Sequence, residues 1–323
     1  MGCGNVFYRK PNHLSAASWQ EILHCIADDV EHIRVTGGEC TLHPEFEDIL
    51  HEIDRLSVPF VVFTNGNWRH AYRIIQVFNS CEHLEGLLIS LHGHDSASHA
   101  RFTQSDSFDV VKRNIRRAAN MGLYIETNTI LLRSNVAFIG EIIEQNISLG
   151  AAAVAFSRYY GQALPALEIS PEELHDALAQ IAEHRSQDPR VTLNNCVPYC
   201  FLSDLDLPTK GCTSGFSHGT IDPWGNLRPC THSPVILGNV FKQDIADIWS
   251  GKLLDRWRNL IPEACHDCAA FSICRGGCRA TAYHRKLDRD PLMRSPKKTL
   301  SPTYAPLRLP RNICPIPSYT LRE

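Results

Sequence analysis

Apolar residues recur at helical and strand-like spacings along the first half of the chain. In residues 19–30 the apolar positions fall on one face of a helix, and Ser15 or Ser18 can cap its start. The same spacing predicts helices over residues 44–56, 70–78, 108–121, 137–149 and 171–184. Short apolar runs between them predict strands over residues 32–36, 58–63, 84–91, 123–132 and 151–156.

This alternation predicts an α/β fold with a parallel sheet, because continuous apolar strands are those that helices cover on the faces of a sheet. In such folds the working residues lie at the carboxyl ends of the strands. The segment opens with a helix, whereas a parallel α/β domain normally opens with a strand, so we expect a first strand to be missing from this sequence. The last 33 residues contain seven prolines, which is typical of an extended tail.

Composition adds a chemical clue, because 13 of the 323 residues are cysteine. No apolar run is long enough for a transmembrane helix and no secretory signal begins the chain, so we expect a cytoplasmic protein in a reducing compartment. Cysteines there are better candidates for metal ligands than for disulfides. The net charge of −3 gives no reason to expect binding to nucleic acid or to a membrane.

Nine of the cysteines lie after residue 195, and their spacing is the strongest chemical signal in the chain. Between Cys265 and Cys278, four cysteines are separated by two, five and three residues, so their thiolates can converge on a metal ion or a cluster. Upstream, residues 219–230 predict a hairpin that ends at Cys230. The cysteines that precede the hairpin are Cys196, Cys200 and Cys212. Spacing alone leaves zinc and iron–sulfur clusters equally open.

The order of these cysteines resembles the SPASM domain, the auxiliary-cluster domain of many radical SAM enzymes, over residues 196–293. The resemblance implies two 4Fe–4S clusters. Ligands of the first would be Cys200, Cys212, Cys230 and Cys278, with Cys200 preferred to Cys196 because it lies nearer in sequence. Ligands of the second would be Cys265, Cys268 and Cys274. The family's fourth ligand follows an Asp-Pro pair, but here Met293 follows Asp290, so either Cys314 substitutes or one iron stays open.

The first half resembles a radical SAM domain, a partial barrel of six α/β units. Gly37, Gly38 and Glu39 match the family's Gly-Gly-Glu motif, in which glycines let the backbone approach a ligand and the carboxylate accepts from an ammonium group such as that of SAM. Residues 64–66 match the Thr-Asn-Gly that often ends the third strand. The resemblance implies further contacts to SAM from Ser90, Arg101 and Asn128. The histidines at 92, 94 and 99 are interpreted as a polar loop.

The family's CxxxCxxC motif, which binds the catalytic cluster, is not present as a whole. Cys3 lies 34 residues before Gly37, a distance that suits the third cysteine of the motif. With the missing strand, this predicts a sequence that begins inside the motif, and one thiolate is not expected to support efficient SAM cleavage. The predicted fold is therefore a partial (β/α)6 TIM-like barrel lacking its first strand over residues 1–190, a SPASM domain over 191–293 and a proline-rich tail over 294–323.

The resemblance also implies a function, that of a maturase acting on a peptide or protein. SAM would be cleaved at the 4Fe–4S cluster to a 5′-deoxyadenosyl radical that abstracts hydrogen from the substrate, and auxiliary clusters would aid substrate binding or electron transfer. A reductant such as flavodoxin or ferredoxin is the expected partner. Two other hypotheses stay open at this point, a degenerate non-catalytic binding protein and a zinc-binding cysteine-rich scaffold.

Overall fold

The computed structural model describes residues 14–209 and 211–294. Within them, six parallel strands form one sheet in which each strand pairs with the next in chain order. Parallel neighbours follow from the sequence pattern, because helical segments return the chain between successive strands. The strands are β1 (Ile33–Val35), β2 (Phe60–Thr64), β3 (Leu84–Ser90), β4 (Ile125–Leu131), β5 (Ala153–Arg158) and β6 (Val191–Leu193).

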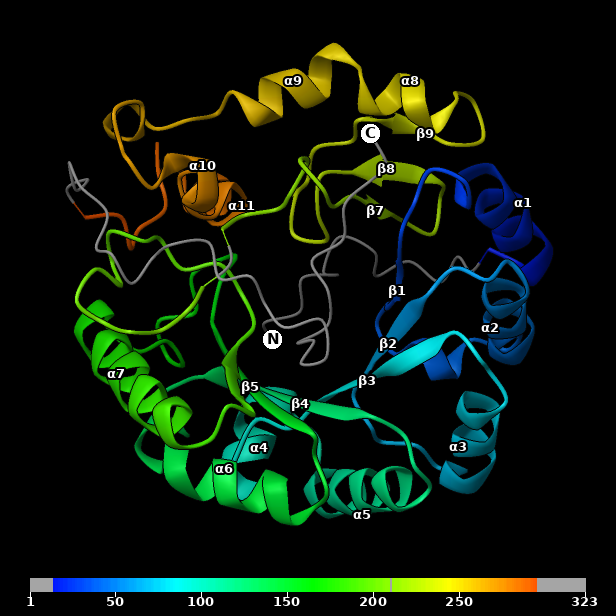
Figure 1. The fold of residues 1–323 in the computed structure, drawn as a ribbon, viewed down its shortest axis with the longest axis horizontal. Helices are drawn as coiled ribbons and strands as arrows, with labels where there is room; N and C mark the ends of the chain where they lie inside the picture. Colours follow the sequence, from blue (N-terminus) through cyan, green and yellow to red (C-terminus); the bar gives the residue numbers. More distant parts are fainter. Residues whose placement is uncertain (1–13, 210, 295–323) are drawn as a thin grey trace.

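Helices lie outside the curved sheet and cover its outer face (Figure 1). The helix that follows β5 shows how the sequence fixes their ends, since Ser170 and Glu173 form a capping box around a proline at the first helical position. The helices of this half are α1 (Ala16–Ile26), α2 (Phe46–Arg55), α3 (Ala71–Asn79), α4 (Ser96–Thr103), α5 (Phe108–Asn120), α6 (Ile139–Ser148) and α7 (Pro171–Gln187).

Strand residues alternate between the helix-covered face of the sheet and its inner face. On β4, Ile125 and Leu131 are buried in the two cores that the sheet shares with the helices. The residues between them at even positions, Glu126 and Asn128, therefore point to the inner face. The inner face thus carries polar side chains in the middle of an otherwise apolar sheet.

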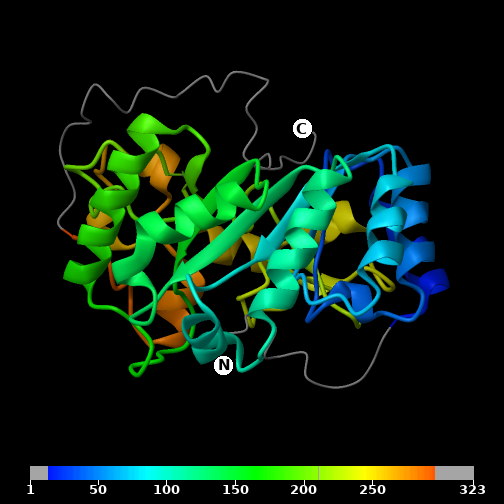
Figure 2. The same ribbon diagram turned by 90° about the horizontal axis from the view of Figure 1, so that it is seen from below.

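Residues 211–294 form a smaller unit that closes the ring between the first and the last strands of the sheet (Figure 1). Seen from below, its yellow and orange segments lie behind the strands (Figure 2). Its core includes Leu227, Ile248, Leu254 and Trp257, and Cys278 is buried with them. The elements are the antiparallel β7 (Thr220–Ile221), β8 (Asn226–Arg228) and β9 (Gly238–Asn239), and α8 (Ile245–Trp249), α9 (Lys252–Arg258), α10 (Phe271–Cys274) and α11 (Arg279–His284).

The five predicted strands, their parallel order and the predicted hairpin are confirmed. In the barrel, α4 and the three-residue β6 were not predicted, and β6 pairs with β5 and extends the sheet beyond residue 190. The expectation of a missing first strand falls on residues 1–13, and the predicted tail falls almost wholly on 295–323, both outside the described residues. No helix in the described part of the chain is long and apolar enough to span a membrane.

Candidate cofactor and cluster sites

Glu39 ties the loop that follows β1 to the loop that follows β2. Its carboxylate accepts hydrogen bonds from Thr64 Oγ1 and the backbone N of Asn65, both at 2.6 Å, and from Thr41 Oγ1 at 2.7 Å. The bonds from Thr64 and Asn65 join the two motifs singled out in the sequence, so the Gly-Gly-Glu and Thr-Asn-Gly segments form one structure. The carboxylate oxygens are acceptors with further lone pairs, which leaves capacity for a cationic ligand.

Space remains beside the two glycines that precede Glu39. Gly37 and Gly38 are exposed, and a Cβ added at Gly38 would meet no atom within 4 Å. By contrast, Gly66 has φ +69°, and a Cβ there would lie 2.7 Å from Ile89 Cγ2. The second loop is therefore packed tightly into the core, while the first leaves room beside the backbone at Gly38.

Ser90 and Asn128 lie side by side on the inner face of the sheet. They are partners in the register between β3 and β4. Asn128 Oδ1 accepts a hydrogen bond from Ser157 Oγ at 2.8 Å, which orients the amide group. Arg101 is an exposed residue of α4, in the segment that follows β3. The structure therefore brings Ser90 and Asn128 together, with Arg101 on the helix that follows.

The histidines of the segment after β3 are part of the folded core. His92 Nδ1 accepts from the backbone N of Ile130 at 3.2 Å, and His99 Nδ1 accepts from the backbone N of His92 at 3.2 Å. Burial lowers the pKa of His92 to about 3 and that of His99 to about 4, so both rings are neutral at pH 7. His94 stacks on Phe138 with ring centroids 3.7 Å apart. Structural packing, rather than an open polar loop, explains His92 and His99.

One group of thiols forms around Cys196. Its thiol is hydrogen-bonded to Cys212 and Cys278, and these bonds raise the pKa of Cys196 and lower the pKa of its two partners. The hydroxyl and the backbone N of Thr281 also donate to Cys278 Sγ, at 3.3 and 3.5 Å. Cys230 completes the group, and burial, with the charges of Cys278 and Cys212, raises its pKa to about 12.

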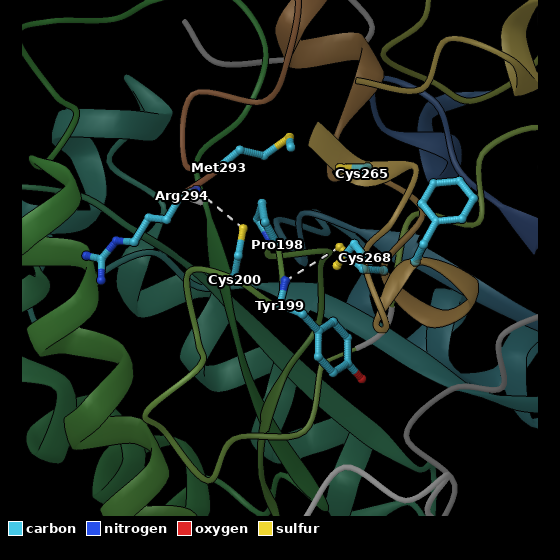
Figure 3. A pocket seen from close by; sticks show the side chains of 10 residues that line it. Pro198, Tyr199, Cys200, Cys265, Cys268, Met293 and Arg294 are labelled. Carbon is cyan, nitrogen blue, oxygen red and sulfur yellow. Dashed lines mark hydrogen bonds between the residues drawn. The ribbon is translucent and has the colours of Figure 1, made fainter. Parts of the chain in front are cut away.

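A second group of thiols lines a cavity (Figure 3). Burial and the neighbouring thiols raise the pKa of Cys265 to about 11, and burial also raises the pKa of Cys274. Three backbone N–H groups, including that of Tyr199 at 3.5 Å, donate to Cys274 Sγ and partly offset this effect. The four cysteines that line the cavity are Cys200, Cys265, Cys268 and Cys274.

The placement of two cysteines differs from the sequence-based expectation. Cys200 does not join Cys212 and Cys278 but lies in the second group, and Cys196, interpreted as an ordinary thiol, takes the place in the first. The two residues are four positions apart in a loop, and the chain turns between them, so nearness in sequence was a poor guide. Cys3 and Cys314 lie outside the described residues.

A buried ion pair connects these thiols to the barrel. Arg158, the last residue of β5, donates through Nη1 to Asp290 Oδ1 at 3.0 Å and through Nη2 to Oδ2, and the two side chains are 3% and 0% exposed. Arg158 Nε also donates to the backbone O of Cys196 at 2.9 Å, and Asp290 accepts from the backbone N of Cys278 at 2.7 Å. Burial alone would lower the pKa of Arg158, but the charge and hydrogen bonds of Asp290, together with the charges of Cys196 and Cys278, outweigh it and the pKa is raised.

Neither Arg158 nor Asp290 was identified from the sequence as functional. The signal that could have found the pair is a single arginine at the end of the apolar strand β5. Between residues 14 and 294, leaving out residue 210, no three or more His, Cys, Asp and Glu side chains are arranged as ligands of a single metal ion. The chain does provide two sets of four neighbouring thiols, and thiolates are the ligands by which proteins hold iron–sulfur clusters. The donor set therefore fits two such clusters.

Family models match both halves of the chain. The model described as Radical SAM superfamily covers residues 2–144, and the SPASM model, described as Iron-sulfur cluster-binding domain, covers residues 212–269. The chain carries a radical SAM domain followed by a SPASM domain. The cofactors that go with these domains are SAM and 4Fe–4S clusters, as the sequence resemblance implied.

Similar proteins of known name span most of the chain. A PqqA peptide cyclase of Methylobacterium nodulans (strain LMG 21967 / CNCM I-2342 / ORS 2060) is 24% identical over 93% of this chain and 82% of its own length. The antilisterial bacteriocin subtilosin biosynthesis protein AlbA of Bacillus subtilis (strain 168) is 23% identical over 78% of this chain and 58% of its own. Streptococcus suis SuiB bound to the precursor peptide SuiA has a TM-score of 0.74 at 17% identity, covering 90% of this chain and 72% of SuiB. SuiB therefore shares the fold of this chain.

Proposed function

We propose that this protein is a radical SAM maturase that modifies a peptide or protein substrate. The observation that carries the proposal is the position of the first thiol group at the carboxyl end of β5, where Arg158 and Asp290 hold Cys196 and Cys278. Because the carboxyl ends of parallel strands meet at one edge, the Gly-Gly-Glu loop and the inner-face polar residues lie at the same edge. Cofactor, substrate and auxiliary clusters would thus share one face of the barrel.

The loop after β1 is the proposed site for SAM. The backbone carbonyls of Gly37 and Gly38 are proposed to accept from the amino group, while Glu39 holds the loop in place and adds a carboxylate. Ser90 and Arg101 are proposed to bind the carboxylate of SAM and Asn128 its ribose, from the neighbouring strand ends. When bound together, a reduced 4Fe–4S cluster and SAM supply a 5′-deoxyadenosyl radical that abstracts hydrogen from the substrate.

A peptide is the proposed substrate class. Relatives of this chain are named for work on peptides, including the PqqA peptide cyclase, and SuiB binds a precursor peptide. Polar side chains on the inner face of the sheet, among them the half-buried Asn128, are proposed to orient the substrate beside the SAM site.

Electron supply completes the proposal. A small reductant such as flavodoxin or ferredoxin would deliver the electron that SAM cleavage needs, and Cys3 is proposed as one ligand of the SAM-binding cluster. We propose that the protein lies in the cytoplasm, because a chain with 13 cysteines keeps free thiols in a reducing compartment.

The test uses the protein produced from its complete reading frame and reconstituted anaerobically with iron and sulfide. Reduction in the presence of SAM should yield 5′-deoxyadenosine, and the Gly38→Leu variant should lose it. A side chain at Gly38 enters space that is free of protein atoms, so it blocks SAM without disturbing the fold. We expect SAM affinity to fall at least about tenfold, or about 1.4 kcal/mol, with melting temperature and iron content unchanged.

Three results would contradict the proposal. Zinc bound in place of iron would support the cysteine-rich scaffold instead. A full complement of iron without 5′-deoxyadenosine would support a non-catalytic binding protein. Unchanged SAM affinity in Gly38→Leu would mean that SAM binds elsewhere.

A further inference from the structure

Cys200 reaches the second thiol group from a distant part of the chain. It follows β6 in sequence, whereas its neighbours Cys265, Cys268 and Cys274 all come from the segment around α10. All four cysteines line one cavity. Figure 3 shows Cys200, Cys265 and Cys268 around this cavity.

The lining of the cavity also includes the residue that stands where the family's fourth cluster ligand is expected, downstream of Asp290. Met293 lines it, and the thioether sulfur of methionine is a poor ligand for an iron–sulfur cluster. Met293 lies beside Arg294, whose backbone N donates to Cys200 Sγ at 3.3 Å. The chain after Asp290 therefore returns to the cavity, but it brings a backbone donor to Cys200 rather than a thiol of its own.

Backbone N–H groups donate hydrogen bonds to two of these sulfurs. Arg294 N donates to Cys200 Sγ, and Tyr199 N donates to Cys274 Sγ at 3.5 Å. Hydrogen bonds of this kind stabilise thiolates and tune the clusters that they hold. The N–H that donates to Cys274 Sγ thus belongs to Tyr199, the residue next to Cys200. Cys200 and Cys274 therefore each accept a backbone hydrogen bond beside the same cavity.

We propose that Cys200 is the fourth ligand of the auxiliary cluster held by Cys265, Cys268 and Cys274. This inference rests on the proposed function, because it assumes that the second thiol group holds an iron–sulfur cluster. It makes that cluster fully ligated by protein, with no open iron. Neither Cys314 nor Met293 is then required, and the cysteine that the family usually places downstream is replaced by one placed upstream.

The test compares cluster content and electron paramagnetic resonance spectra of the reconstituted full-length protein and its variants. Cys200→Ala should lose between about one and four irons per chain, depending on whether the three remaining thiols retain a smaller cluster, and should change the spectrum of one auxiliary cluster. Cys314→Ala should match the unchanged protein. As a matched control, Cys25→Ala removes an exposed thiol remote from either group and should also have no effect.

A rescue variant guards against simple misfolding. Met293 lines the same cavity, so Met293→Cys in the Cys200→Ala background places a thiol beside the three others and should restore iron content and the original spectrum. Unchanged iron and spectrum in Cys200→Ala, loss of iron in Cys314→Ala instead, or failure of the rescue would each overturn the inference. If the unchanged protein itself binds no iron, the proposed function fails; if it binds iron and forms 5′-deoxyadenosine while Cys200→Ala changes nothing, only this inference fails.

Discussion

Replacing Asp290 with alanine tests how strongly the SPASM unit is held against the barrel. The carboxylate accepts two hydrogen bonds from Arg158, one from the backbone N of Cys278 at 2.7 Å and one from that of Leu292 at 3.0 Å. The variant leaves the Arg158 guanidinium buried at 3% exposure without its counter-charge. Folding then requires a buried, unpaired charge.

The expected loss of stability is large. Removing one partner of a buried ion pair costs about 3–5 kcal/mol because the remaining charge is uncompensated. The backbone N of Cys278, left without its acceptor, costs about 1–3 kcal/mol. These contributions overlap, so we expect a decrease of at least about 4 kcal/mol in the free energy of unfolding. That is a major part of the stability of a typical domain, about 5–15 kcal/mol.

Equilibrium unfolding in urea, followed by tryptophan fluorescence, measures this change. Arg158→Met in the Asp290→Ala background removes both charges and should recover part of the loss, so the double variant is less destabilised than the sum of the single variants. Arg190→Ala is the control, since its partner Asp188 lies on the surface and the pair contributes less than about 1 kcal/mol. A decrease below about 1 kcal/mol for Asp290→Ala would refute the reasoning.

Two further predictions concern the barrel. Gly66 and Gly122 both have positive φ, +69° and +88°, but only a Cβ at Gly66 meets a neighbour, Ile89 Cγ2 at 2.7 Å. Gly66→Ala should therefore lower the melting temperature more than Gly122→Ala, whose cost is backbone strain of about 1 kcal/mol, and equal shifts would contradict the packing argument. The second prediction is a pH dependence from His92 and His99, whose pKa values of about 3 and about 4 lie below the ordinary 6.5. The unfolded chain binds these protons more tightly, so stability is full above pH 6.5 and falls as the pH decreases toward 4. His99→Gln should flatten this fall by up to about 1.4 kcal/mol per pH unit in urea titrations, and an unchanged slope would exclude the assignment.

Much of the barrel was predictable because its strands are continuous apolar runs. β2 and β4 were found from hydrophobicity alone, within a few residues of their observed ends. β6 was missed because Val191–Leu193 is too short to form a recognisable run, and its stability comes from pairing with β5. α4 was missed because Ser96–Thr103 mixes polar and apolar residues without a clear face, and its start is set by the cap at Asp95.

The cysteine spacing identified which thiols matter but not how they divide. Cys265, Cys268 and Cys274 were grouped correctly as neighbours of one another, because residues so close along one segment share a site. The division between Cys196 and Cys200 depends on how a loop turns, which local sequence does not encode. Arg158 and Asp290 are 132 residues apart, so only the three-dimensional fold brings them together.

The junction between the sheet and the first thiol group is too short and too firmly hydrogen-bonded to act as a hinge. Only Asn194 and Asn195 separate β6 from Cys196. The backbone N of Asn194 donates to the backbone O of Phe156 at 2.8 Å, and the side chain of Asn195 forms two hydrogen bonds with the backbone of Arg158. Relative movement of rigid bodies needs residues that can change their backbone angles freely, and here those residues are fixed. We therefore expect any motion that admits a substrate to occur in other segments, with the distance from the sheet to Cys196 unchanged.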